Sequence, residues 1–179
     1  ISPLLIVQWR TIFAFATLSI VFLVLRKKFF FNDLNEFYWL IISGSILGVH
    51  WIAFFKSIQE STVAIGLLSF ASYPLFTTIM EPLFLKESYK RKNFLSTLLV
   101  LFGIALIASS KIDDNEIISG SVFQGILWGL AAGLGFAVLT LINRVNVRNK
   151  SPLVLTCWQN GFAALVLIPW SFSESSIIS

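Results

Sequence analysis

Long runs of apolar residues with few charges dominate the hydrophobic pattern of this 179-residue chain. Each run reaches the roughly 18 to 20 residues that a helix needs to cross a hydrocarbon layer about 30 Å thick. A membrane barrel would instead alternate apolar and polar residues in segments of about ten. The pattern therefore predicts an all-α, polytopic membrane helix bundle. The six expected spans are residues 3–25, 37–55, 61–80, 93–110, 117–143 and 151–173.

The composition agrees with a membrane protein, because 56% of the residues are hydrophobic and only 12% are charged. Soluble domains have about 25% charged residues. Cys157 is the only cysteine and His50 the only histidine. This stretch therefore offers neither a disulfide framework nor a thiolate or multi-histidine metal centre, and we expect no cofactor. Cys157 is expected to be a small buried apolar residue.

The positive charges predict which ends of the spans face the cytoplasm. Ten of the thirteen Lys and Arg residues follow the first, third and fifth spans. They are Arg26, Lys27, Lys28, Lys86, Lys90, Arg91, Lys92, Arg144, Arg148 and Lys150. By the positive-inside rule this side is cytoplasmic. Because the topology explains the basic residues, we do not expect nucleic acid to be a partner.

One segment occurs twice, as SPLLIVQWRTIFAFATL at residues 2–18 and as SPLVLTCWQNGFAALVL at residues 151–167. The two copies agree at seven positions with an offset of 149 residues, and five expected spans separate their starts. An odd number of crossings gives the copies opposite orientations, which is the inverted-repeat arrangement of many secondary transporters. The sequence thus predicts two repeats of five helices each. We expect this chain to be a fragment of such a ten-helix protein that lacks the first helix and the last three.

Residues 57–109 carry a series of features in a fixed order. They are the polar start Ser61 and Thr62, the mid-span Pro74, the acidic Glu87, the basic Arg91 and Lys92, and then Gly103 and Ile107. With the small-residue segment QGILWGLAAGLGFAVL at residues 124–139, this order resembles the EamA repeat of the drug/metabolite transporter superfamily. The resemblance implies that residues 1–110 are the last four helices of the first repeat. Residues 111–119 would be an external loop, and residues 120–179 the first two helices of the second repeat.

The resemblance implies transport, by export or uptake, of a small metabolite through alternating access, with proton coupling left open. The expected partners are a small-molecule substrate, the lipid bilayer and the missing helices of the same chain, and a homodimer is left open. We expect a multi-pass protein of the inner (plasma) membrane. The alternatives are a membrane-embedded enzyme and a non-transporting scaffold. The chain has no nucleophile motif or glycine-rich phosphate loop, so we expect it not to be an enzyme.

Two spans carry polar stripes, which usually face a bundle interior or a water-filled pathway. In the second span Ser43, His50 and Ser57 recur every seven residues. His50, near mid-membrane, is a candidate for binding substrate or carrying a proton. The alternative is a neutral histidine that is hydrogen-bonded to a neighbouring helix.

The third span presents five polar or small residues on one helical face. They are Thr62, Gly66, Ser69, Tyr73 and Thr77. Pro74 removes a backbone donor and should kink the helix, exposing the Phe70 carbonyl. We expect Ser69, Tyr73 and Thr77 to contact substrate. The alternative is a packing kink whose hydroxyl groups bond to their own backbone.

Two further residues of the central spans are candidates with alternatives. Glu81 could accept a proton, or it could be held by Lys86 or Lys90 at the membrane interface. Trp128 could form a stacking wall for an aromatic or cationic substrate, or it could simply pack against a neighbour.

Other residues have a structural or positional interpretation. Gly125, Gly129 and Gly133 recur every four residues and should allow close helix packing. Arg10 in the first copy of the repeat corresponds to Gln159 in the second. Arg10 could attract an anionic group to the outer vestibule, or its side chain could extend outward to the interface.

Overall fold

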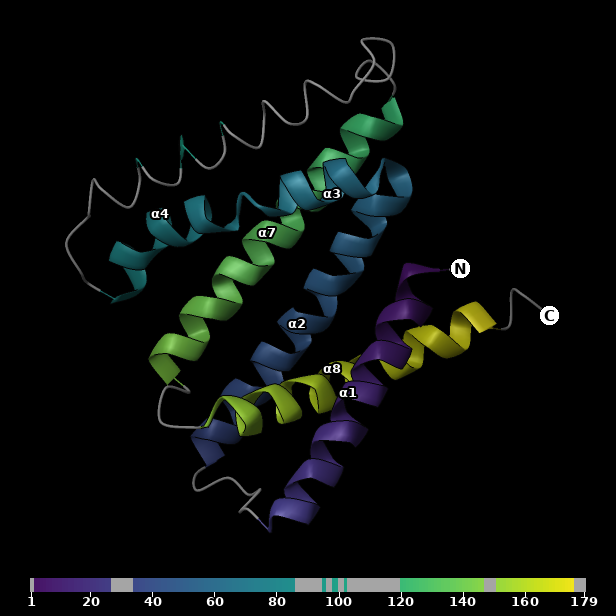
Figure 1. Cartoon of the computed structure of the whole chain (residues 1–179), viewed down its shortest axis with the longest axis vertical. Coiled ribbons are helices and arrows are strands. Elements are labelled where there is room, and N and C mark those ends of the chain that lie inside the picture. The colour runs from purple at the N-terminus through teal and green to yellow at the C-terminus, as the bar shows by residue number, and fades with distance from the viewer. Residues whose placement is uncertain are drawn as a thin grey trace. The chain divides into compact units, whose positions relative to one another are not determined.

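The computed structural model describes residues 2–26, 34–85, 120–146 and 151–175, together with residues 95, 98, 99 and 102. Every regular element in the described residues is helical, as Figure 1 shows. The elements are α1 (Pro3–Leu25), α2 (Leu34–Glu60), α3 (Val63–Phe70), α4 (Tyr73–Leu85), α7 (Gly120–Asn146) and α8 (Pro152–Ser175). The predicted all-α class is therefore confirmed for this part of the chain.

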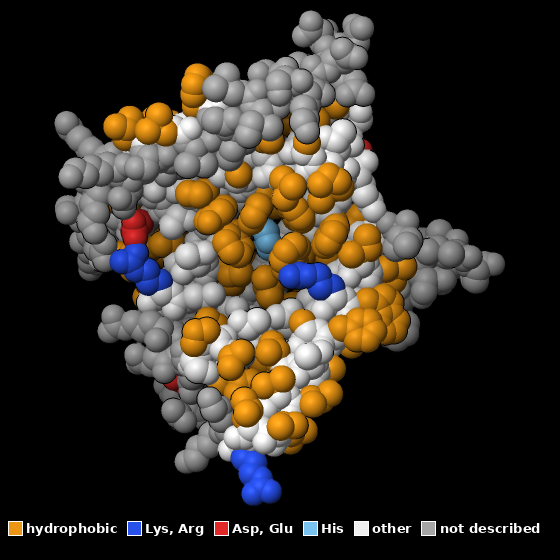
Figure 2. All heavy atoms as spheres, in the orientation of Figure 1, with side chains coloured by type: hydrophobic (Ala, Val, Ile, Leu, Met, Phe, Trp, Pro, Cys, Tyr) orange, Lys and Arg blue, Asp and Glu red, His pale blue; other side chains and the backbone are white. Residues whose placement is uncertain are grey.

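Five stretches of the described chain are long and apolar enough to cross a membrane. They are Pro3–Leu25, Leu34–Glu60, Val63–Leu85, Gly120–Val145 and Pro152–Ser171. Among the described residues, hydrophobic side chains cover much of the face shown in Figure 2, and Lys, Arg, Asp and Glu side chains are few there. Such a surface suits contact with lipid rather than with water. Five of the six expected spans are thus present as helices of sufficient length.

Several expectations fall on residues that the structure does not describe. The sixth expected span, residues 93–110, is almost wholly outside the described residues, and so is the expected loop at 111–119. The same holds for most of the basic residues that assign the two sides of the membrane, and for Glu87, Gly103 and Ile107. The sixth span, the membrane orientation and the ten-helix repeat therefore stay predictions.

Both copies of the repeated segment begin a helix in the same way. Ser2 is the N-cap of α1, and its side chain accepts a hydrogen bond from the amide of Leu4. The Ser151 side chain likewise accepts from the amide of Val154, and α8 begins at the next residue, Pro152. A serine oxygen satisfies an amide that lacks a partner within the helix, and a first-turn proline needs no partner. The repeat thus includes the local structure at its start.

The described helices fall into two compact units, and α2 and α7 each contribute to both. The first unit, residues 1–49 and 142–179, is built on the crossing of α1 and α8 (Figure 1). Gln8 contacts Ala164 in this crossing, whereas Ser19 contacts Cys157. Later residues of α1 therefore meet earlier residues of α8, and the two helices run antiparallel.

The first half of α2 completes the first unit by packing on α8. A Cβ atom built on Gly44 would lie 2.9 Å from the backbone carbonyl of Gln159, so the two helix backbones approach closely here. Leu40 and Phe162 form a small buried cluster beside this contact. Cys157 is fully buried, as predicted for a small apolar residue.

The second unit, residues 50–141, contains the second half of α2 with α3, α4 and most of α7. The Ser57 hydroxyl donates to the carbonyl of Gly125 at 2.6 Å, and His50 pairs with Ala132. These two pairs show that α2 and α7 run antiparallel. Ser57 and His50 are both buried, so the predicted burial of their polar stripe is confirmed.

The predicted role of the glycines of α7 is also confirmed. Gly125 packs against Ser61, Gly129 against Ser69, and Gly133 against Ser72. A Cβ atom on Gly133 would lie 2.8 Å from the Ser72 hydroxyl oxygen and 3.1 Å from the Phe70 carbonyl oxygen. Small residues on both sides therefore let α7 approach the α3 and α4 segment closely.

The third expected span, residues 61–80, is helical and is interrupted before Pro74, where the sequence predicts a loosened turn. The interruption is a full break rather than a kink, because α3 ends at Phe70 and α4 begins at Tyr73. Pro74 lies in the first turn of α4, where its missing amide hydrogen and fixed φ favour a new helix start. Thr62 does not belong to the helical face of this span, since it is the N-cap of α3 and accepts from the amide of Ile65.

Candidate solute site

His50 is buried on α2, with 2% of its surface exposed. Its Nδ1 lies 2.8 Å from the carbonyl oxygen of Ala132 on α7. Because a carbonyl oxygen only accepts, Nδ1 carries the hydrogen of this bond. The neighbouring helix thus orients the imidazole. This hydrogen bond is the one expected if His50 has a structural role. The ring keeps a second nitrogen capable of acid–base chemistry.

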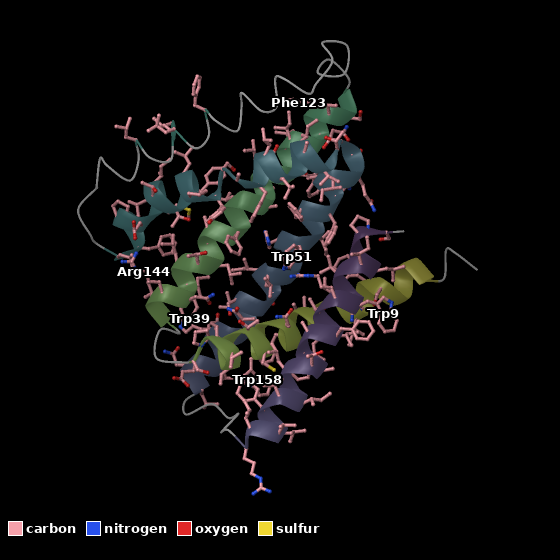
Figure 3. All side chains as sticks on the ribbon, viewed as in Figure 1. Trp9, Trp39, Trp51, Phe123, Arg144 and Trp158 are labelled. Carbon is pink, nitrogen blue, oxygen red and sulfur yellow. The ribbon has the colours of Figure 1, made fainter. Side chains whose placement is uncertain are left out.

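Aromatic rings surround this imidazole. The ring centroid of His50 lies 5.0 Å from that of Trp51, 5.3 Å from that of Phe70 and 5.2 Å from that of Phe136. The Tyr73 ring stacks on Phe70 and meets Phe136 edge-on, at centroid distances of 5.4 and 5.1 Å. We call these five side chains the aromatic cluster. Figure 2 shows the imidazole among hydrophobic side chains, and Figure 3 labels Trp51 on α2.

The break between α3 and α4 lies at the aromatic cluster. Pro74 has no amide hydrogen, so the Phe70 carbonyl lacks the donor that a continuous helix would supply four residues on. The Ser69 carbonyl next to it accepts from the Ser72 hydroxyl at 2.6 Å and from the Ser72 amide at 3.2 Å. The expected opening of the backbone at Phe70 is therefore present, in the form of a turn between two helices.

The structure brings together two of the five predicted substrate-binding residues. His50 and Tyr73 share Phe70 and Phe136 as ring partners. Ser69 precedes Phe70 in the chain, and its side chain lies against Gly129 of α7. Thr77 lies one turn further along α4, and its hydroxyl donates to the Tyr73 carbonyl at 2.9 Å. This bond to its own helix is the one expected if Thr77 has a packing role and does not contact substrate.

Trp128 and Glu81 lie apart from this group. Lys56 Nζ sits over the Trp128 ring, 4.6 Å from its centroid, and no ring contact in the described residues joins Trp128 to the aromatic cluster. The face of Trp128 is thus occupied by a cation of the protein itself. Glu81 is half-buried on α4, and its two expected lysine partners are outside the described residues.

Arg10 and Gln159 hold equivalent places in the repeat but have different surroundings. Arg10 is exposed on α1, whereas Gln159 is 5% exposed on α8. Gln159 Nε2 donates to Asn143 Oδ1 at 2.7 Å. The second copy therefore uses this position for a buried polar contact, and the role of Arg10 as an anion attractor stays a prediction.

Some residues near the candidate site could not be singled out from the sequence. Phe70 and Phe136 define the aromatic cluster, yet the chain contains 18 phenylalanines and nothing in the pattern marks these two. In the first unit, Gln8 was missed as well. It is 5% exposed on α1, and its Nε2 donates to the Ala164 carbonyl at 3.2 Å. The available signal was an amide side chain within an otherwise apolar span.

The first unit contains a cavity of about 230 Å³ between α1 and α8. Hydrophobic side chains and Gly161 line it, among them Ile12, Phe15 and Trp158 (Figure 3 labels Trp158 on α8). Such a lining suits hydrocarbon rather than a polar solute. In the part of the chain that is described, no group of three His, Cys, Asp or Glu residues could hold a metal ion.

The chain is similar to proteins that are named as transporters. The sequence model of the EamA-like transporter family matches residues 1–109. "Uncharacterized transporter YxxF" of Bacillus subtilis is 28% identical over 127 residues, which are 71% of this chain and 40% of that protein. An "Uncharacterized transporter" of Helicobacter pylori is 28% identical over 92 residues, 51% of this chain and 30% of that protein. "Solute carrier family 35 member G1" of Mus musculus is 27% identical over 141 residues, 76% of this chain and 38% of that protein.

These matching stretches span less than half the length of each relative. No solved structure matches the chain. The family match nevertheless covers more than half of the 179 residues, and the described helices include five that are long and apolar enough to cross a bilayer. The chain is therefore an integral, multi-pass membrane protein, and it belongs to the EamA-like transporter family.

Proposed function

We propose that the full-length protein moves a small polar solute across the membrane and that the aromatic cluster contacts this solute. The observation that carries the proposal is His50, an ionisable side chain buried in a helix able to span the bilayer. Such residues are costly in a membrane and mark solute or proton pathways. Membership of a transporter family supports the same function.

The chemistry of the cluster suits a solute with both apolar and polar parts. Phe70, Tyr73 and Phe136 offer ring faces, and the Tyr73 hydroxyl and the His50 imidazole offer hydrogen-bonding groups. The break between α3 and α4 adds a carbonyl, that of Phe70, without its helical donor. Interrupted helices contribute such backbone groups to solute sites in other transporters.

Alternating access between inverted repeats is the proposed mechanism. Gln8 and Cys157 are equivalent in the repeat, and so are Phe15 and Ala164, each pair being 149 residues apart. Gln8 donates to the carbonyl of Ala164, and the Cys157 thiol donates to the carbonyl of Phe15. Exchanging the two copies turns one contact into the other, which is the signature of a two-fold axis. This pairing supports an inverted repeat centred on the crossing of α1 and α8.

Several details of the proposal go beyond transport itself. We place the protein in the plasma membrane, with a small molecule as substrate, either exported or taken up. Proton coupling through His50 and assembly as a homodimer are further alternatives. A membrane-embedded enzyme is the rival function, and it would release a chemically changed product rather than move an unchanged solute.

The test is transport by the full-length protein reconstituted in lipid vesicles. A panel of radiolabelled amino acids, sugars, nucleosides and organic cations would identify a solute by saturable, protein-dependent uptake, and chromatography of the vesicle contents would detect any chemical change. Tyr73→Phe and Ser69→Ala each remove one hydroxyl with little volume. We expect each to weaken solute affinity about fivefold, the value of one hydrogen bond of about 1 kcal/mol.

Thr140→Val is the matched control, because the Thr140 hydroxyl is exposed on α7 and donates to the Phe136 carbonyl of its own helix. It should leave affinity unchanged. If well-folded Tyr73→Phe and Ser69→Ala proteins bind the solute as the wild type does, the aromatic cluster is not the site. Absence of uptake for the whole panel, with a changed compound in the vesicles, would favour the enzyme.

A further inference from the structure

The Gln8 side chain has one polar atom more than its packing contact uses. Gln8 is 5% exposed, and its Nε2 donates to the carbonyl of Ala164 across the α1 and α8 crossing. Its Oε1 is buried and accepts no hydrogen bond from any residue that the structure describes. A buried amide oxygen without a donor is unfavourable, and the hydrocarbon around a spanning helix offers none.

The neighbouring hydroxyl on the same helix does not fill this need. Thr11 lies one turn further along α1 and is fully buried. Its Oγ1 lies 2.9 Å from the backbone carbonyls of both Val7 and Gln8, so its single hydrogen is directed to its own backbone. This arrangement leaves no donor at Thr11 for Gln8 Oε1.

The repeat supplies an internal comparison for Gln8. Cys157 occupies the equivalent position on α8 and makes the equivalent contact, since its thiol donates to the Phe15 carbonyl at 3.9 Å. A thiol has one hydrogen, and its sulfur is only a weak acceptor. The bond to the opposite backbone carbonyl therefore requires only a donor. The Cys157 sulfur also lies 3.8 Å from the Ser19 hydroxyl, whereas the residue equivalent to Ser19 beside Gln8 is Ile168, which has no side-chain donor. The amide oxygen of Gln8 goes beyond what packing at this position needs.

We propose that Gln8 is a solute-contacting residue and that its Oε1 accepts a hydrogen bond from an N–H or O–H group of the transported solute. This inference rests on the proposed transport function. An acceptor that is fixed by its own Nε2 bond to Ala164 selects for donors such as amine, amide or hydroxyl groups. It selects against a carboxylate or phosphate oxygen at the same place, because two acceptors repel.

Cysteine accessibility tests the inference in two steps, and the first step needs no identified solute. Gln8→Cys is introduced into the full-length protein carrying Cys157→Ala, and a charged, water-soluble methanethiosulfonate is the probe. Cys157 itself shows that a cysteine can make the cross-helix contact, so we expect the variant to fold. A residue that contacts solute must be reached by water in at least one state of the transport cycle, so the new thiol should react in the folded protein.

Two controls use the same helix pair. Wild-type protein, with Cys157 fully buried, should stay unlabelled. Phe13→Cys, at a position on α1 that is 64% exposed, should also stay unlabelled by a charged reagent if that face meets lipid. A solute from the transport panel should slow labelling of Gln8→Cys at least several-fold. If the solute does not slow the labelling, position 8 is reached by water but not by the solute, and the proposed solute contact is wrong.

If folded Gln8→Cys is not labelled at all, the inference is also wrong. The transport assay is a separate result and would not be affected.

A second variant keeps the inference testable if Gln8→Cys does not fold. Gln8→Ser keeps a donor but withdraws the oxygen from the place of Oε1. It should raise the half-saturating solute concentration about five- to tenfold. An analogue whose donor group is methylated should bind the wild-type protein more weakly than the solute does. In Gln8→Ser the analogue and the solute should bind with nearly the same affinity. Equal losses in both proteins would contradict the proposal.

Discussion

Gln159 on α8 donates its Nε2 hydrogen to Oδ1 of Asn143 on α7, across 2.7 Å. Gln159 is 5% exposed, so the contact ties two spanning helices together out of reach of bulk solvent. In the other copy of the repeat Arg10 takes this position and is exposed. The equivalent position therefore joins two helices in the second copy, whereas in the first it lies at the surface of its helix.

Asn143→Leu should destabilise the protein by removing this partner. The Gln159 amide would stay buried without a partner, which costs about 1–3 kcal/mol in the free energy of unfolding. Thermal unfolding of the detergent-solubilised full-length protein should show a lower Tm. Adding Gln159→Leu should recover much of the loss, since removing both partners leaves no unsatisfied group. A double variant as unstable as the sum of the two single variants would show that the contact contributes nothing.

Gly129→Ala should destabilise the second unit by separating α7 from the α3 segment. A Cβ atom on Gly129 would collide with the side chain of Ser69 and come within 2.9 Å of the Ser57 hydroxyl oxygen. Overpacking of this kind costs about 1–3 kcal/mol. The measurement is the Tm of the purified protein.

Gly135→Ala on the same helix is the control for that substitution. Its Cβ atom would meet His50 at 3.5 Å, an ordinary contact distance. Alanine also favours a helix interior over glycine by up to about 1 kcal/mol. We therefore expect an unchanged or raised Tm, and a similar fall in both variants would mean that close approach at Gly129 is not the cause.

The sequence was sufficient to predict those features that depend on composition and short-range periodicity. Apolar run length predicted the spanning helices, and the four-residue spacing of Gly125, Gly129 and Gly133 predicted close packing. The break after Phe70 was predicted only as a kink. Pro74 signals both outcomes, and the choice between them depends on the Ser69 and Ser72 contacts that form in the folded chain.

The candidate site could be predicted only in part. Polar residues in apolar spans, such as His50 and Tyr73, stand out in a sequence because they are costly there. Their ring partners do not, since 15% of the residues in the chain are aromatic. Thr77 and Trp128 were selected for their position on a helical face, and their actual partners are a carbonyl of the same helix and Lys56.

The orientation of the chain can be tested with single cysteines in a Cys157→Ala background. By the positive-inside rule, cysteines at Asn32, Lys90 and Asn149 should react with an impermeant maleimide only after the membrane is opened. A cysteine at Asp114 should react in intact cells. Labelling of Lys90→Cys from outside would contradict both the orientation and the inverted repeat.

His50→Asn should separate the structural contact of the imidazole from its other nitrogen. The asparagine Nδ2 can take the place of Nδ1 and donate to the Ala132 carbonyl, so we expect a Tm close to that of the wild type. Asparagine offers no group that gains or loses a proton between about pH 5 and 8. If His50 carries a proton during transport, uptake by this variant should lose its pH dependence in that range, and His50→Leu should lose stability as well. The measurement is uptake over a pH series, with equal amounts of each variant in the vesicles. It shows whether His50 carries a proton during transport. A pH profile identical to that of the wild type would exclude His50 as the proton carrier and leave the bond to Ala132 as its function in this helix pair.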